Sequence, residues 1–296
     1  MKLRELGEDR LLGQLLPSFS TGKDVLVGAG DDCAVVCSPG KNHLLLLKAD
    51  CIVEKIHFAS LADPVAVGWK GMMRPLSDFA AMSGLPQFAL VTLIVPGKTS
   101  TIWVNKLYRG MQRAAARFRV SIVGGETSDT HGPAAISVAV AGFVEKTRVV
   151  LRRGGKAGDD LFVTGKLGGS LSRKHLRFLP RIEESRWLTQ NFPVHAMIDL
   201  SDGLGADLPR LAKASKLSFK IETEALPLTA GCNVDDAISD GEDYELLFAI
   251  ASRHRKRLHR SWARKFPKVP LTRIGSLTQP SAPNSQPLLR GYVHFQ

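Results

Sequence analysis

The sequence predicts an α/β protein with two domains. Short apolar runs rich in β-branched residues alternate with longer amphipathic segments in both halves of the chain. The glycine-rich, charged stretch RRGGKAGDD follows residue 146 and is typical of a connection. With 296 residues, the chain is long enough for an N-terminal domain over 1–146 and a C-terminal α/β domain over 147–296.

The N-terminal half alternates strands and helices. Its apolar runs predict strands over 44–47, 88–95, 119–123 and 134–144. Asp63 and Pro64 form a helix start, with Asp as N-cap and Pro in the first turn, and Pro75 is expected to kink or split this helix. A second helix is predicted from Thr101 to Phe118, because its apolar residues recur on one face.

The C-terminal half shows the same alternation. Strands are predicted over 160–164, 195–199, 217–222 and 245–251, and helices over 180–190, 202–214 and 252–265. The composition of 278–288 predicts a loop before the terminal GYVHF.

The composition favours a cytoplasmic globular protein. Hydrophobic residues make up 44% and charged residues 23% of the chain, and no run is long and apolar enough to predict a membrane span. The N-terminal segment MKLRELGEDRLLGQLL is too charged for a signal peptide. The four cysteines lack CxxC spacing, which predicts a reducing compartment and no zinc site.

The chain is basic, with 40 Lys and Arg against 28 Asp and Glu, a net charge of +12. This excess suits anionic partners such as phosphorylated small molecules or nucleic acid. Much of it lies in 253–265, which we interpret as the solvated face of a helix. No nucleic-acid-binding motif accompanies that run.

Acidic residues recur at the ends of apolar runs or beside Gly and Ser. They are Asp31 and Asp32 in GAGDDCAVV, Asp50, Asp78, Glu126, Asp199, Asp202, Glu242 and Asp243. One such acid is usually a helix cap, and Asp202 before GLGADL is an N-cap candidate. The whole set, with neighbouring glycines and no interleaved His or Cys, favours Mg²⁺ and phosphate binding. This chemistry is phosphoryl transfer, although the chain contains no P-loop and no protein-kinase motif set, and Gly165–Gly169 is interpreted as a turn.

Eleven motifs in order along the chain resemble the thiamine-monophosphate kinase family, of the aminoimidazole ribonucleotide synthetase-like ATP-binding superfamily. They include GAGDDCAVV, KADCIVEKIHF, LSDFAAMSG, IVGGETS, RRGGKAGD, VTGKLGGS, AMIDLSDGLGADL, DGEDYELLF and GYVHF. The resemblance implies direct transfer of the ATP γ-phosphoryl group to thiamine monophosphate, assisted by several Mg²⁺ ions. It also implies a homodimer in which the N-terminal domains pair strands.

The resemblance also implies the roles of matching residues. The metal ligands would be Asp32, Asp50, Asp78, Glu126, Asp199 and Asp202. The ATP-binding residues would be Lys48, Tyr108, Gly125, Arg152 and Ser201. The substrate-binding residues would be His57, Glu242 and Tyr292. No membrane partner is expected.

This sequence departs from the family pattern at several of these positions. Lys48 and Ala49 stand where many relatives have Ser and Thr, and Glu126 replaces a shorter Asp. Two alternatives remain open at this point: another phosphoryl-transfer enzyme of the superfamily, or a nucleotide- or nucleic-acid-binding protein without catalysis. The absence of Cys before residue 28 argues against a selenophosphate synthetase, and the ending HFQ argues against the hydrogenase-maturation branch.

Overall fold

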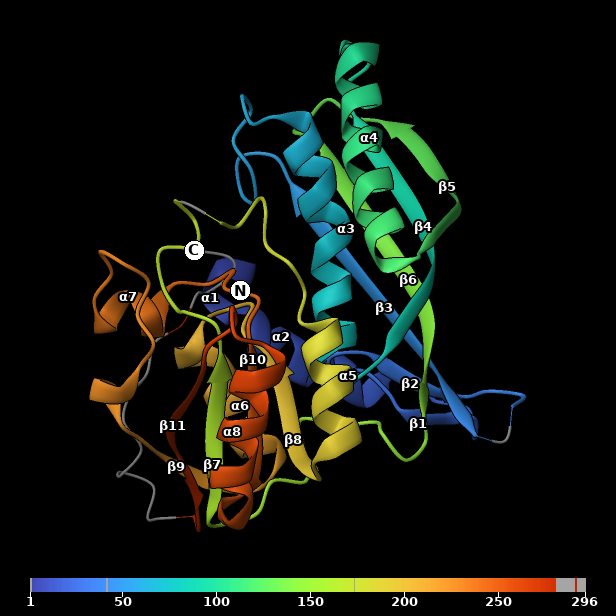
Figure 1. Ribbon diagram of the computed structural model, residues 1–296. Helices are drawn as coiled ribbons and strands as arrows, with labels where there is room; N and C mark the ends of the chain where they lie inside the picture. The colour runs from blue at the N-terminus through green and yellow to red at the C-terminus, as the bar shows by residue number, and fades with distance from the viewer. Residues whose placement is uncertain (1, 41, 173, 281–290, 292–296) are drawn as a thin grey trace.

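Two β-sheets organise the protein (Figure 1), in a computed structural model that describes residues 2–40, 42–172, 174–280 and 291. The first sheet has six strands in the order β1-β2-β3-β6-β4-β5, and the second has five in the order β8-β10-β7-β11-β9. All strands before residue 146 lie in the first sheet and all strands after 147 lie in the second.

The strands of the first sheet are β1 (Val25–Val27), β2 (Ala34–Cys37), β3 (His43–Val53), β4 (Leu85–Val95), β5 (Ser121–Asp129) and β6 (Ala135–Glu145). Those of the second are β7 (Asp159–Thr164), β8 (Val194–Asp199), β9 (Ser218–Ile221), β10 (Leu246–Ala251) and β11 (Leu271–Thr278). The pairing of β4 with β5 is parallel, and the other strand pairs are antiparallel.

The helices are α1 (Leu3–Leu6), α2 (Glu8–Leu15), α3 (Pro64–Ala81), α4 (Thr101–Phe118), α5 (Ile182–Asn191), α6 (Leu204–Ala214), α7 (Val234–Ser239) and α8 (Arg255–Lys265). Short 3-10 turns cover Leu16–Ser18, Thr223–Ala225 and Ser252–His254. None of the helices among the described residues is both long and apolar enough to cross a membrane.

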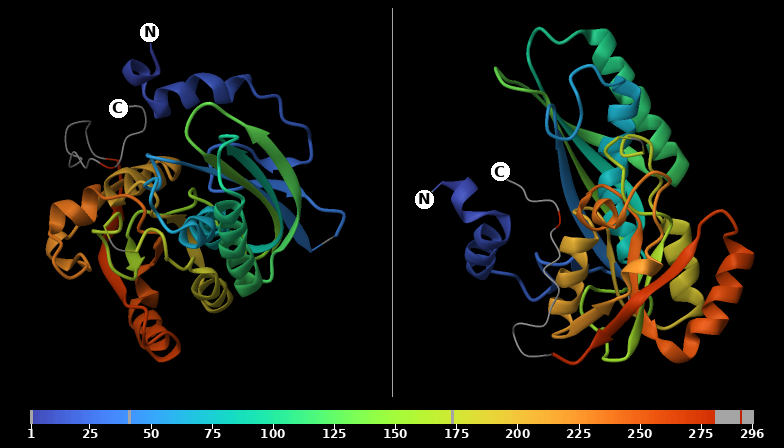
Figure 2. Two further views of the ribbon diagram at one scale, coloured as in Figure 1. Left: turned by 90° about the horizontal axis from the view of Figure 1, so that it is seen from above. Right: turned by 90° about the vertical axis from the view of Figure 1, so that its left-hand side faces the viewer.

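Helices α3 and α4 cover one face of the first sheet (Figure 2). Asp63 caps α3 by accepting a hydrogen bond from the Val65 amide, as the sequence predicts. The two helices approach closely at Gly68 and Gly110, where a Cβ atom on either would lie 2.0 Å from a backbone oxygen of the other helix. Glycine at these two positions therefore allows the backbones of α3 and α4 to approach each other closely.

The second sheet is covered on both faces, which explains why every residue of β7 is buried. Phe162 and Phe248 stack at 5.6 Å on the face that packs against α5 and α8. Leu161 and Leu247 face the opposite way, into the smaller core cluster beneath α6. The first of these faces is continuous with the core of the first sheet.

The other face of the first sheet is apolar and exposed. Leu47, Phe88, Leu90 and Val123 are 41%, 48%, 50% and 58% exposed. They line a shallow hollow of about 400 Å³ with small residues of β6. Exposed apolar surface of this kind is typical of a protein contact.

Several predicted boundaries are wrong. The strand predicted over 44–47 is β3, which runs from His43 to Val53, and the strand predicted over 119–123 is β5, which begins at Ser121 and runs to Asp129. Both extensions contain polar residues that interrupt the apolar pattern while the backbone ladder continues. Helix α3 is not split, because Pro75 is accommodated inside one continuous helix.

The predicted domain boundary after residue 146 coincides with the change of sheet. The larger core cluster nevertheless contains residues of both sheets. The division into domains 1–146 and 147–296 therefore stays a prediction.

Candidate active site

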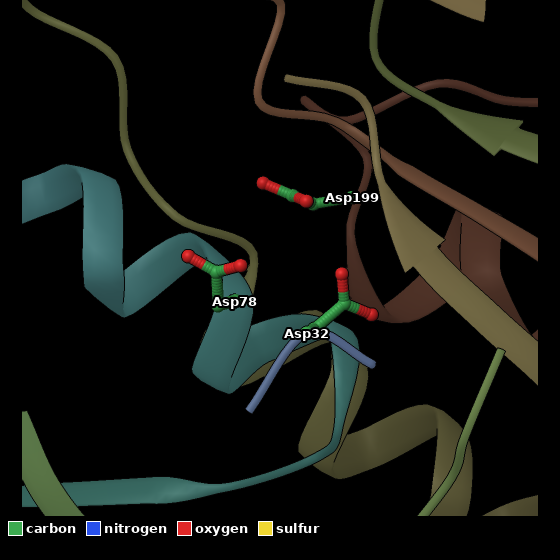
Figure 3. A group of neighbouring side chains, drawn as sticks. All are labelled: Asp32, Asp78 and Asp199. Carbon is green, nitrogen blue, oxygen red and sulfur yellow. The ribbon is translucent and has the colours of Figure 1, made fainter. Parts of the chain in front are cut away.

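Three buried carboxylates from distant parts of the chain meet between the two sheets. Asp32 lies in the turn before β2, Asp78 lies near the end of α3, and Asp199 is the last residue of β8. Carboxylate oxygens of all three lie within 4.8 Å of one another, and their side chains face a common space (Figure 3). We call Asp32, Asp78 and Asp199 the acid triad.

Local hydrogen bonds hold the acid triad in place. The Ser77 hydroxyl donates to Asp199 Oδ2 at 2.6 Å, which joins α3 to β8. In the GAGDD turn, the Asp31 carboxylate accepts hydrogen bonds from the backbone amides of Asp32 at 3.0 Å and Arg152 at 3.2 Å. Asp31 therefore joins the GAGDD turn to the segment after β6. Of the two neighbouring acids, Asp32 is the one that belongs to the acid triad.

Burial makes the negative charges of the acid triad costly. Burial, together with the charge of Asp32, raises the pKa of Asp199 to about 7. Burial also raises the pKa of Asp78 well above its ordinary range. Carboxylates in this position favour protonation or a bound cation. Positive charge beside the acid triad would therefore stabilise its ionised form.

Two cationic side chains supply part of that charge. Arg152 donates to Asp32 Oδ1 from Nε at 3.1 Å and from Nη2 at 2.6 Å. Lys48 Nζ lies 2.7 Å from Asp78 Oδ1 and 4.0 Å from Asp50 Oδ1. Burial alone lowers the pKa of the Lys48 ammonium, but the charges of Asp78 and Asp50 raise it above its usual value.

The acid triad fits a divalent cation. Asp32 Oδ2 is buried and has no hydrogen-bond partner among the described residues. A buried carboxylate oxygen without a partner is unfavourable unless a cation or water completes it. The donor set consists of oxygen atoms only, which Mg²⁺ prefers.

A second polar cluster surrounds Lys70, which is 0% exposed on α3. Its ammonium donates to Glu242 Oε2 and to the His57 carbonyl, both at 2.6 Å, and lies 2.9 Å from His175 Nδ1. His175 Nδ1 also lies 3.0 Å from Glu242 Oε2. We call Lys70, His175, Glu242 and His57 the Lys70 cluster.

Glu242 has both a strongly lowered pKa and an unfavourable backbone conformation. Burial opposes its ionisation, but the hydrogen bond from His175 and the charge of Lys70 lower the pKa of Glu242 to about 2. Burial lowers the pKa of Lys70 to about 8. Glu242 also adopts φ 64°, an unfavourable conformation for a residue with a side chain. Its amide donates to the Ser201 carbonyl at 2.7 Å, which holds this conformation.

The structure brings some of the predicted site residues together. Asp50 lies on β3 next to Lys48, beside the acid triad. Ser201 and Glu242 are joined through the backbone, and Glu242 and His57 both contact Lys70. The His57 imidazole accepts a hydrogen bond at Nδ1 from the Val53 amide at 3.0 Å.

Glu126 is not brought to the acid triad within one chain. Asp50, Val138, Val91 and Gly125 form one row across the first sheet. Side chains alternate between the two faces of a sheet. Glu126, the next residue along, therefore points to the exposed face, away from α3. The strand predicted over 119–123 would leave Glu126 beyond its end, but Glu126 lies within β5.

The remaining predicted residues lie elsewhere. Asp202 is not the N-cap of α6, which is Gly203; its carboxylate pairs with Arg210, and its amide donates to Asp207. Tyr108 packs against the larger core cluster from α4. Tyr292 lies outside the described residues.

Three residues of this region were missed by the sequence analysis. Lys70 carries a signal, because it is a single lysine among apolar residues in VAVGWKGMM. A charge buried on a helix usually has a partner. Ser77 directly precedes Asp78 but carries no distinguishing pattern. His175 lies in a segment of turns and is the first residue of the motif HLRFLPRI, one of the eleven motifs, but the resemblance assigned it no role.

Comparison with known proteins identifies the family. Residues 30–144 match the family model for "AIR synthase related protein, N-terminal domain". The chain is 38% identical to the thiamine-monophosphate kinase of Rhodopirellula baltica over 86% of this chain and 84% of the relative. It is 32% identical to that of Haemophilus influenzae, with 92% of each chain covered. A solved structure described as AaThiL complexed with AMPPCP and TMP superposes with a TM-score of 0.85 at 31% identity, covering 99% of both chains. The chain therefore belongs to the thiamine-monophosphate kinase family.

Proposed function

We propose that this protein transfers the γ-phosphoryl group of ATP directly to thiamine monophosphate, forming thiamine diphosphate and ADP. The acid triad, with its partnerless Asp32 oxygen, is the observation that carries the proposal within this chain. Membership of the family and the likeness to the structure complexed with AMPPCP and TMP support the reaction and its two substrates. Both substrates are anionic, which suits the net charge of +12.

In this proposal Asp32, Asp78 and Asp199 hold Mg²⁺, with Asp50 beside them. Bound Mg²⁺ would neutralise the phosphate oxygens during transfer. Arg152 and Lys48 are already oriented toward the same carboxylates and would contact the phosphate chain of ATP. Asp202, Ser201, Gly125 and Tyr108 remain proposed contacts of the metal or nucleotide.

The Lys70 cluster is the proposed place for thiamine monophosphate. The thiazolium ring carries a positive charge, and Glu242 is held ionised by Lys70 and His175. The Glu242 amide donates to the Ser201 carbonyl, and this bond connects Glu242 to the segment that follows Asp199 at the acid triad. His57 and Tyr292 are proposed as further substrate contacts.

We further propose that the protein acts as a homodimer through the exposed face of the first sheet. Leu47, Phe88, Leu90 and Val123 on that face would be buried by a second copy. Glu126 points to the same face, so in a dimer its carboxylate would be directed toward the second subunit rather than toward its own acid triad. Its proposed role as a metal ligand therefore requires the dimer.

The reaction is tested by incubating the purified protein with ATP, Mg²⁺ and thiamine monophosphate. Thiamine diphosphate is followed by fluorescence after oxidation, and thiamine serves as the control acceptor. We expect product from the monophosphate alone. Bound ATP without any product would favour the alternative of a binding protein, and the exposed basic residues of α8 would then be tested for salt-sensitive nucleic-acid binding.

A further inference from the structure

Lys48 places a positive charge of the protein itself beside the acid triad. It projects from β3, and its ammonium contacts Asp78 at 2.7 Å and approaches Asp50 at 4.0 Å. Asp78 belongs to the acid triad, and Asp50 lies beside it on β3. An ammonium that joins two carboxylates satisfies the same charges that a bridging divalent ion would satisfy.

The carboxylates Asp50 and Asp78 at one end of the site and Asp32 at the other have different partners in the protein. At the end occupied by Asp50 and Asp78, Lys48 supplies a direct ionic contact, and the buried charge of Arg74 acts on the same two carboxylates. At the other end, Asp32 Oδ2 has no partner among the described residues. Each end thus carries one cationic side chain in ionic contact, Lys48 or Arg152, but Arg152 contacts only Oδ1 of Asp32 and leaves Oδ2 open to an ion.

We propose that the Lys48 ammonium is a built-in cation that takes the place of one divalent ion between Asp50 and Asp78. It would bridge these carboxylates to a phosphate oxygen of the nucleotide and so reduce the number of metal ions bound with it. The inference rests on the proposed function, because it assumes that nucleotide and metal share this site. It goes further by assigning one cation position, between Asp50 and Asp78, to a side chain of this protein.

The test counts metal ions rather than turnover. Binding of Mn²⁺ in the presence of the ATP analogue AMPPCP is measured by electron paramagnetic resonance of free Mn²⁺ for the wild type, Lys48→Thr and Lys48→Met. Lys220→Thr is the matched control, since Lys220 is an exposed strand lysine of the second sheet. We expect both Lys48 variants to bind about one additional Mn²⁺ per chain, because removing the ammonium frees Asp50 and Asp78. The control should bind the wild-type number.

An unchanged Mn²⁺ count in both Lys48 variants would overturn the inference. Failure of the wild type to bind AMPPCP would instead contradict the proposed function, so the two failures are distinguishable. Thermal unfolding gives a second readout: Mn²⁺ should raise the midpoint of Lys48→Thr more than that of the wild type. Should both neutral variants fail to fold, Lys48→Arg retains the charge and must keep the wild-type count; an extra ion in it would also refute the inference.

Discussion

Replacing Lys70 with Met removes the ammonium at the centre of the Lys70 cluster. Among the described residues, Glu242 then keeps the hydrogen bond with His175 and the nearby charge of Arg74, and the His57 carbonyl loses the hydrogen bond from Lys70. Removing one partner of a buried ion pair costs about 3–5 kcal/mol, since the other charge is left uncompensated. The pKa of Glu242, lowered from 4.5 to about 2, corresponds to about 3 kcal/mol of stabilisation of the carboxylate by its surroundings.

We therefore expect Lys70→Met to lower the free energy of unfolding by about 3 kcal/mol at neutral pH. The lower end of the range applies because Glu242 retains His175 and is 12% exposed. If Glu242 holds the thiazolium ring, the KM for thiamine monophosphate should also rise about tenfold, which corresponds to about 1.4 kcal/mol. The KM for ATP should change much less.

The assay is a double-mutant cycle with Lys70→Met, Glu242→Gln and the double variant, followed by urea unfolding. Lys106→Met, which replaces an exposed lysine on the neighbouring α4, is the control. In the Glu242→Gln background the loss caused by Lys70→Met should fall to about 1 kcal/mol, because no uncompensated carboxylate remains. Equal losses in both backgrounds would refute the account of Lys70 as the counter-charge of Glu242.

Three further predictions concern other parts of the molecule. Asp199→Asn should abolish turnover while the protein stays folded, as judged by circular dichroism beside the exposed control Asp235→Asn; a fully active variant would contradict the multi-metal model. Leu90→Asp should yield a monomer in sedimentation at micromolar concentration, where the wild type should be a dimer; a monomeric wild type would contradict the proposed interface. The Glu145 carboxylate accepts two hydrogen bonds from Arg186 at 2.6 and 2.7 Å, and chiefly through these bonds the pKa of Glu145 is lowered to about 2. The stabilisation from this pair should therefore be complete above pH 4.5 and be lost as the pH falls toward 2; because the pair is partly exposed, Glu145→Gln should cost about 1 kcal/mol at pH 7 and little at pH 2, measured by urea unfolding.

Much of the fold follows from the sequence because apolar periodicity reports burial directly. Helix α4 is predicted with its observed bounds because its apolar residues share one face, and the structure shows that Ser100 caps it. The strand ends are not predictable in the same way. Lys48 and Asp50 interrupt the apolar alternation of β3, yet they remain in its hydrogen-bonded ladder because the backbone pairs with β6 whatever the side chain.

The composition of the candidate site is predictable only in part. Asp32, Asp78 and Asp199 are conspicuous in the sequence as acids beside turns and element ends. Their convergence depends on how α3 packs against β8, and single-chain periodicity contains no information about that contact. The direction of Glu126 depends on sheet register, and one position along a strand reverses the face.

The acid triad also constrains the order in which the protein can become competent. Asp32 and Asp78 are synthesised with the first sheet, whereas Asp199 and its partner segment follow only after most of the chain has been made. Until β8 is in place, Ser77 lacks the acceptor it has in the finished protein, and the ligand set for a cation lacks one member. The ligand set of the acid triad is therefore complete only when residues of both sheets are in place.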